Sequence, residues 1–101
     1  MRFNMTKVTK KDNTIIIDGH ANYAEYGQDI VCAAVSTLAQ TLICSLEQLT
    51  DIELRNIVTD GFIKIVIEES TEGVQLLVDS FFIGIEGVAV AYPEYVMVAK
   101  H

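Results

Sequence analysis

The sequence has few basic residues and no basic cluster that would suit a phosphate backbone. Its 101 residues include 7 lysines and arginines against 14 aspartates and glutamates, a formal net charge of −7. Binding to nucleic acid requires clustered Lys and Arg side chains that contact phosphates. We therefore expect no direct contact with nucleic acid, whereas the negative field of the chain favours basic partners.

Cysteine is also scarce. The two cysteines, Cys32 and Cys44, are too few for a disulfide framework. If both lie on one helix, about 18 Å separates them along its axis, which is too far for a bridge. They form no Cys-x-x-Cys pair, which disfavours a redox thiol protein, and with His20 they do not show the spacing of a zinc site. We therefore expect a reducing cytoplasm, no metal and no cofactor.

Long uncharged apolar runs are absent as well. The longest candidate, Val74 to Tyr92, is interrupted by Asp79 and Glu86, and none reaches the ~18 residues of a membrane span. The N-terminus lacks an apolar core followed by a small-residue cleavage site. With 50% hydrophobic and 21% charged residues, residues 1–101 are expected to form a single globular domain with no membrane partner.

Periodicity predicts the element order β-β-α-β-β-α-β. The β-branched and apolar runs that predict strands are residues 3–9, 14–19, 52–59, 62–68 and 95–99. A polar turn at 10–13 and the pair Asp60-Gly61 indicate antiparallel hairpins. The predicted fold class is therefore α+β, a largely antiparallel sheet with two helices packed on it.

The first helix is expected to begin after Asp29, a good N-cap, and to end near Leu49. One face is polar, with Thr37, Gln40, Thr41 and Gln48. The other face is apolar, because apolar residues recur at spacings of three and four: Val31, Val35, Leu38, Leu42, Leu46 and Leu49.

The second helix is expected between its caps at 70–72 and Tyr92, because Pro93 disfavours a helical residue before it. Gly84 and Gly87 either weaken this helix or mark close packing against a neighbour. Both helices carry more than one apolar stripe, which predicts contact between them or a dimer interface.

The segment between the second strand and the first helix carries the candidate chemistry. His20 follows Gly19 at the end of a strand, residues 20–28 are interpreted as a loop, and Cys32 follows the expected cap at Asp29 by three positions. At such a helix start, unpaired N–H groups and the helix dipole favour a thiolate and an oxyanion. A histidine in reach accepts the thiol proton and later returns it to the leaving amine. We therefore predict His20 and Cys32 as a catalytic pair.

Each of these residues also has a simpler interpretation. A lone cysteine is most often a small buried hydrophobe, and we take Cys44 as structural. Asp29 either caps the helix, which we favour, or orients His20 as the third member of a triad. Ser36 lies one turn after Cys32 on the same helix face, where it can hydrogen-bond in the floor of the site.

The segments Gly19-His20-Ala21 and Tyr26 to Ser36 resemble the signature of the ribosomal-processing cysteine protease family. The resemblance extends over most of the chain, including the Gly61-Phe62 hairpin and the segment from Tyr92 to Tyr95. It implies that His20 and Cys32 form the catalytic dyad. It further implies supporting roles for Gly19, Asp29 and Ser36, and a substrate-binding loop with Ala21, Asn22, Tyr23, Tyr26 and Gly27.

The resemblance also implies a homodimeric endopeptidase with a specific substrate. The family removes the N-terminal extension of a bacterial large-subunit ribosomal protein precursor, and it cuts after a hydrophobic motif that ends in two phenylalanines. The alternative is a non-enzymatic dimeric module that binds a peptide or a ribosomal partner through the same loop.

Overall fold

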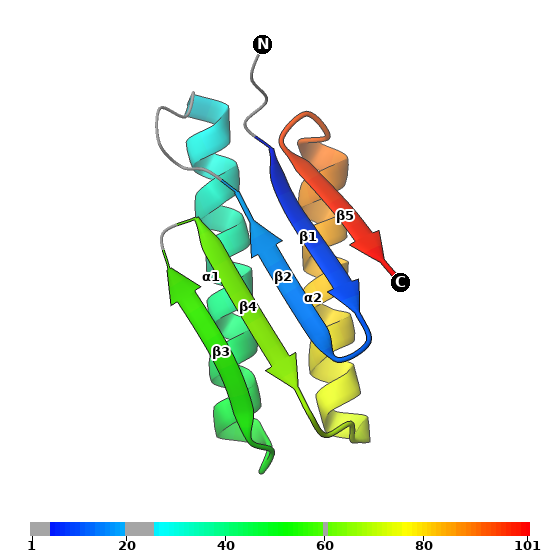
Figure 1. Cartoon of the computed structure of the whole chain (residues 1–101). Coiled ribbons are helices and arrows are strands. Elements are labelled where there is room, and N and C mark those ends of the chain that lie inside the picture. Colours follow the sequence, from blue (N-terminus) through cyan, green and yellow to red (C-terminus); the bar gives the residue numbers. More distant parts are fainter. Residues whose placement is uncertain (1–4, 20–25, 60) are drawn as a thin grey trace.

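The computed structural model describes residues 5–19, 26–59 and 61–101 of the chain (Figure 1). The elements follow in the predicted order, which confirms the α+β class. The strands are β1 (Thr6–Lys11), β2 (Thr14–Asp18), β3 (Leu54–Thr59), β4 (Phe62–Ile67) and β5 (Val96–Lys100); the helices are α1 (Tyr26–Leu49) and α2 (Glu72–Ala91).

The strands form one five-stranded sheet in the order β3-β4-β2-β1-β5. Three of the neighbouring pairs are antiparallel. Two of them are the expected hairpins, and the third, β2 beside β4, was not predicted from the sequence. The exception is β1, which pairs in parallel with β5, so that strands from opposite ends of the sequence lie side by side.

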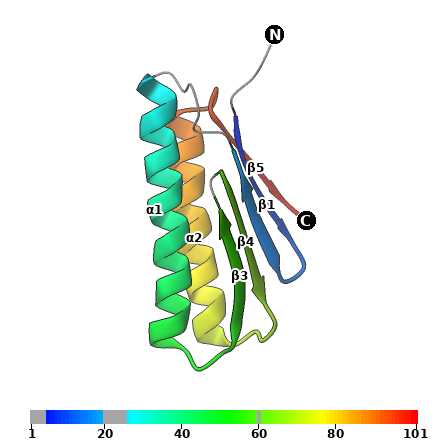
Figure 2. The same cartoon turned by 60° about the vertical axis from the view of Figure 1, so that its left-hand side comes forward.

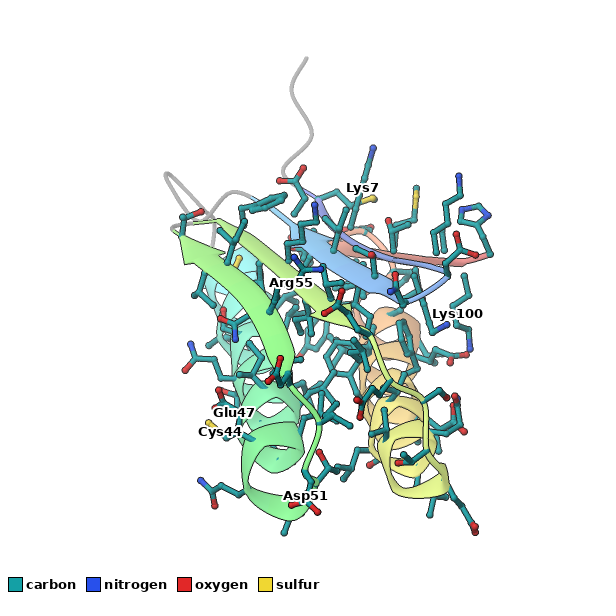
Figure 3. All side chains as sticks on the ribbon, turned by 60° about the horizontal axis from the view of Figure 1, so that its bottom comes forward. Lys7, Cys44, Glu47, Asp51, Arg55 and Lys100 are labelled. Atoms are coloured by element: carbon teal, nitrogen blue, oxygen red, sulfur yellow. The ribbon has the colours of Figure 1, made fainter. Side chains whose placement is uncertain are left out.

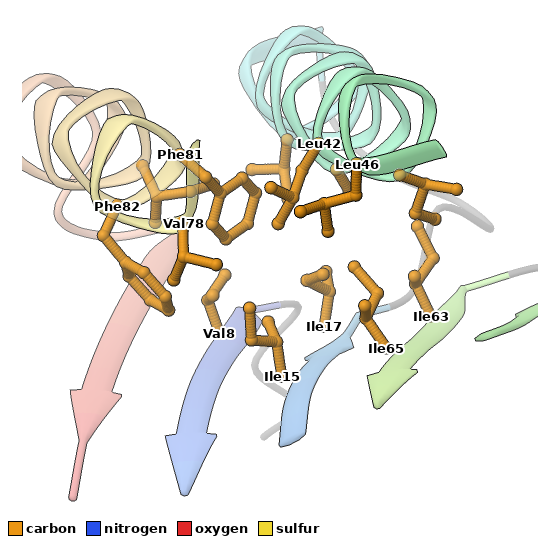
Figure 4. Packing of buried hydrophobic residues seen from close by; sticks show 14 of the residues in the cluster. Val8, Ile15, Ile17, Leu42, Leu46, Ile63, Ile65, Val78, Phe81 and Phe82 are labelled. Atoms are coloured by element: carbon orange, nitrogen blue, oxygen red, sulfur yellow. The ribbon is translucent and has the colours of Figure 1, made fainter. Parts of the chain in front are cut away.

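Both helices cover the same face of the sheet (Figure 2). The core lies between the two layers, where alternate residues of the central strands meet the apolar faces of the helices (Figure 4). Among the side chains that are almost fully buried are Ile15, Ile65, Val31, Leu46 and Ile85. The strict alternation of β4 reflects this one-sided burial, because successive strand residues point to opposite faces.

Helix α1 begins at Tyr26, before the predicted cap at Asp29. The prediction was wrong because it placed the start at the first apolar repeat, whereas the first turn of a helix needs no apolar residue. The prediction of a loop over 20–28 is therefore also wrong for its last three residues. An acidic residue in a first turn is as compatible with the helix dipole as one at the cap.

The two faces of α1 are as expected, with two exceptions. Thr37, Thr41 and Gln48 are exposed, whereas Val31, Val35, Leu42 and Leu46 are buried. Leu49 is 72% exposed because it is the last helical residue. Cys44, interpreted as structural, is also exposed and projects away from the sheet (Figure 3). Its spacing from Thr37, Thr41 and Gln48 places it on the polar face.

Helix α2 has the predicted ends. Its N-cap is Thr71, whose hydroxyl accepts a hydrogen bond from the N–H of Val74, and its C-cap is Tyr92. A Cβ atom on Gly84 would lie 3.0 Å from Leu38 of α1, which confirms close packing of the two helices there. A Cβ atom on Gly87 would meet nothing within 4 Å.

By length and composition, residues Ile30–Leu49 of α1 and helix α2 would each suffice to cross a membrane. No such segment was expected from the sequence because an uncharged run was required, whereas both of these segments contain acidic residues. Core helices of soluble proteins have the same length and composition. Each helix here buries an apolar face against the sheet, as a core helix does.

Candidate active site

A cavity of about 110 Å³ lies where the first half of α1 faces the ends of β1 and β2 and the β3–β4 turn. Three of the predicted site residues, Gly19, Cys32 and Ser36, line it together. The rest of its wall is mostly apolar and comprises Ile17, Val35, Phe62 and Ile63, with Gly61 and two threonines, Thr6 and Thr59.

Cys32 and Ser36 reach the cavity from α1, one turn apart. Between them, Val35 is 2% exposed and fixes this side of the helix against the core. Cys32 is half-buried, so its thiol lies at the border between the core and the cavity. The predicted common face of the two residues is therefore confirmed.

The predicted position of Cys32 in the first turn is wrong. With α1 beginning at Tyr26, Cys32 is its seventh residue. Only the first four N–H groups of a helix are unpaired, and the effect of the dipole falls off within the first turn. The helix start therefore does not supply the oxyanion donors or the thiolate stabilisation that the sequence suggested.

The end of β2 is held at the cavity wall by two glycines. The N–H of Gly19 donates to the carbonyl of Gly61 over 2.9 Å, so β2 continues its pairing with the start of β4. A Cβ atom on Gly61 would lie 2.4 Å from the carbonyl oxygen of Gly19, and one on Gly19 would lie 2.6 Å from Thr6 Oγ1. Side chains at either position would push these segments apart, so glycine fixes the point from which the chain continues to His20.

Thr6 is a polar residue of this cavity that was not among the predicted site residues. It is 3% exposed, and its Oγ1 has no hydrogen-bond partner within the part of the chain that the structure describes. A buried hydroxyl without a partner costs about 1–3 kcal/mol. Its alternation with Val8 could have revealed Thr6, because residues two apart in a strand lie on the same face of the sheet. Val8 is fully buried, so the hydroxyl of Thr6 lies on the core side of β1.

The side chains of the remaining predicted residues are not described by the structure. His20, Ala21, Asn22 and Tyr23 lie outside the described residues. Tyr26, Gly27 and Asp29 have helical backbone in the first turn of α1. Asp29 precedes Cys32 by three positions, and residues three apart share a helix face.

Comparison with known proteins identifies the family. The sequence profile of a family described as cysteine protease Prp matches residues 1–97. The chain belongs to this family. The ribosomal processing cysteine protease Prp of Bacillus subtilis is 31% identical over 90 residues, which cover 82% of this chain and 80% of that one. The protein is thus a cysteine protease of the Prp family.

Solved structures share the fold of this chain. The Streptococcus mutans protein SMU.848 is 36% identical, with a TM-score of 0.77, over 97% of this chain and 93% of its own. Prp from S. aureus with a covalently linked product peptide is 24% identical, with a TM-score of 0.80, over 98% of this chain and 100% of its own. The same S. aureus protease with a substrate peptide gives a TM-score of 0.79 at 23% identity, over 96% of this chain and 98% of its own. At these identities the S. aureus structures show a shared Prp fold.

Proposed function

We propose that this protease removes the N-terminal extension of a bacterial large-subunit ribosomal protein precursor, with Cys32 as the nucleophile and His20 as the base. The observation that carries the proposal is the shared cavity of Cys32 and Gly19. Because Gly19 directly precedes His20, its fixed position starts the following segment at the cavity wall. The family assignment supplies the class of reaction.

The proposed reaction has two halves. Sγ of Cys32 attacks the scissile carbonyl while His20 accepts the thiol proton, and a tetrahedral intermediate forms. When the C–N bond breaks, His20 returns the proton to the leaving amine and a thioester to Cys32 is left. Water then attacks this thioester with His20 as the base, and the carboxylic acid and the thiol are released.

Asp29 is proposed to orient His20. The start of α1 at Tyr26 removes the cap as its role, and the three-residue spacing gives Asp29 and Cys32 a common side of the helix. A carboxylate in that position holds an imidazole in one tautomer and stabilises its charged form. Ser36 is exposed and lines the cavity, and we assign it a supporting role at the rim of the site.

The substrate fits the character of the cavity and of the chain. Ile17, Phe62 and Ile63 form apolar walls suited to a hydrophobic motif that ends in two phenylalanines. A ribosomal protein is basic, and the net charge of −7 attracts a basic partner. Ala21, Asn22, Tyr23, Tyr26 and Gly27 are proposed to contact the bound peptide.

Replacing Thr6 with valine is expected to raise stability and to lower activity. Valine has nearly the same shape but removes a buried hydroxyl without a partner, which should increase the free energy of unfolding by about 1 kcal/mol. If this hydroxyl bonds a polar group of the bound peptide, as we propose, kcat/KM should fall about tenfold. Urea unfolding and peptide hydrolysis measure the two effects, and Thr6→Ser is the control that keeps the hydroxyl. Unchanged hydrolysis by the valine variant would refute the role in binding.

We further propose a cytoplasmic homodimer. Helix α2 exposes Leu76, Ile83 and Val90, which are 63%, 74% and 83% accessible. Their seven-residue spacing aligns them along one side of the helix. Exposed apolar side chains in such a row favour an interface between two copies of the chain.

A thiol-reactive probe separates the proposed protease mechanism from a module that only binds peptides. Cys32 is expected to react at least about tenfold faster than Cys44 at neutral pH, because a histidine that accepts its proton activates a thiol as a nucleophile. Cys44 is an internal control, since it is exposed on the polar face of the same helix. Mass spectrometry of peptides from the labelled protein measures both rates. Equal, slow labelling of both cysteines would contradict the activation of Cys32 and support the binding module.

A further inference from the structure

Strand β3 provides an open sheet edge beside the candidate active site. It is the first strand in the sheet order and pairs with β4 on one side only, among the strands that the structure describes. Its last residue, Thr59, lines the cavity together with Cys32. An extended chain lying along this edge would therefore have one end at the nucleophile.

The unpaired backbone groups of this edge can be assigned from the hydrogen-bond pattern. The carbonyl of Gly61 accepts a hydrogen bond from the N–H of Gly19. Every second residue of β4, counted from Gly61, therefore directs its N–H and C=O groups toward β2. The intervening residues of β4 direct theirs toward β3, where the paired residues are Arg55, Ile57 and Thr59. The N–H and C=O groups of Asn56 and Val58 consequently point to the open edge.

This edge lacks the features that protect most edge strands. Residues 56–59 contain no charge and no proline, and Ile57 and Val58 are 54% and 50% exposed. The one charged residue of β3 is Arg55, which is labelled in Figure 3. It forms an ion pair with Glu68, the residue after β4. Natural proteins usually block exposed edges with charges, proline or bulges, because a bare edge pairs with other chains.

The helix layer leaves room for a further strand. Val58 lies opposite Ile63, which is buried, so its side chain is on the helix side of the sheet. Half of it is nevertheless exposed, which shows that α1 does not cover the edge at this point.

We propose that the peptide substrate is held as an additional strand on β3, with its main chain hydrogen-bonded to Asn56 and Val58. This rests on the proposed function, because the occupant is the peptide to be cleaved. A peptide is favoured over a second copy because the edge ends at the cavity of Cys32, and a protease must hold its substrate extended across the nucleophile. Main-chain bonds then supply affinity, and alternate side chains of the peptide supply specificity.

Amide hydrogen exchange tests this proposal without requiring cleavage. The full chain carrying Cys32→Ala is saturated with a synthetic peptide that spans the two-phenylalanine motif, and exchange is followed by NMR. The amides of Asn56 and Val58 should slow at least about tenfold, whereas that of Ile57, already paired with β4, should change little. Unchanged exchange at both edge amides would overturn the proposal.

Methylated peptides provide a second measurement that leaves the protein unaltered. A methyl group on a peptide nitrogen removes one donor, and in a strand only alternate nitrogens face β3. Methylation at alternate positions should therefore weaken binding at least about tenfold, and methylation at the positions between should not. Equal effects at all positions would contradict strand pairing.

The two proposals fail separately. Cleavage by the unaltered protein without protection of Asn56 and Val58 would overturn strand pairing and leave the proposed function standing. Protection of both amides without cleavage would support strand pairing and contradict the proposed function.

Discussion

Replacing Cys32 with alanine is expected to abolish cleavage of a peptide that carries the hydrophobic motif. Without the sulfur no thioester forms, and removal of a catalytic nucleophile lowers kcat at least about ten-thousandfold in comparable proteases. The fold should be preserved, because Cys32 is only half-buried and borders a cavity. Mass measurement of the products and urea unfolding test the two statements.

The matched control is Cys44→Ala. Cys44 lies on the same helix, is exposed on its polar face and does not line the cavity of Cys32. Its replacement should leave cleavage within about twofold of the parent, since surface substitutions away from a site have small effects. Undiminished turnover by the Cys32 variant would end the assignment of the nucleophile, and an equal loss in both variants would indicate that helix α1 itself is disturbed.

Replacing Gly61 with alanine is expected to have the largest effect on stability, about 2–4 kcal/mol. Its φ of 78° is in the left-handed region, which costs a residue with a Cβ atom about 1–2 kcal/mol. The added Cβ would also lie 2.4 Å from the carbonyl oxygen of Gly19, a backbone atom that moves only with its strand. The hydrogen bond between Gly19 and Gly61 should lengthen or break, and most of the cleavage activity should be lost with it.

Two other glycines are controls for the same experiment. In Gly87→Ala the added Cβ atom would meet nothing within 4 Å, and the residue lies in a helix. The free energy of unfolding should therefore rise by up to about 1 kcal/mol. Gly84→Ala meets a side-chain carbon of Leu38 at 3.0 Å and should give a smaller loss than Gly61→Ala. Urea unfolding of the three variants measures the order. A Gly61 variant as stable as the parent would show that the turn and the end of β2 separate at little cost.

Local sequence pattern was sufficient to predict the elements of this fold. The apolar runs on either side of Asp60-Gly61 predicted the strands that form β3 and β4, and the apolar repeats of α1 and α2 predicted helices packed on a sheet. These signals are strong because each element buries one side only, so its apolar residues recur with the period of a helix or a strand. The start of α1 was not predictable in this way, because residues 26–28 carry no apolar repeat.

The site was predictable only in part. The sequence motif predicted Gly19, Cys32 and Ser36 as site residues, and all three line one cavity in the structure. Thr59 and Phe62 were missed because they reach that cavity through the pairing of β4 with β2, which no local spacing reveals. Thr6 was missed for the same reason: that its side of β1 is covered by helices is a property of the whole fold.

The pairing of β1 with β5 has a consequence for when the protease becomes active. The N–H of Thr6 donates to the carbonyl of Tyr95 over 2.8 Å, and the two strands pair from Thr6 to Lys10. During translation, β1 is synthesised long before β5 exists, since chains are made from the N-terminus. The cavity wall at Thr6 is therefore incomplete on a nascent chain, and catalytic competence should arise only after β5 has left the ribosome.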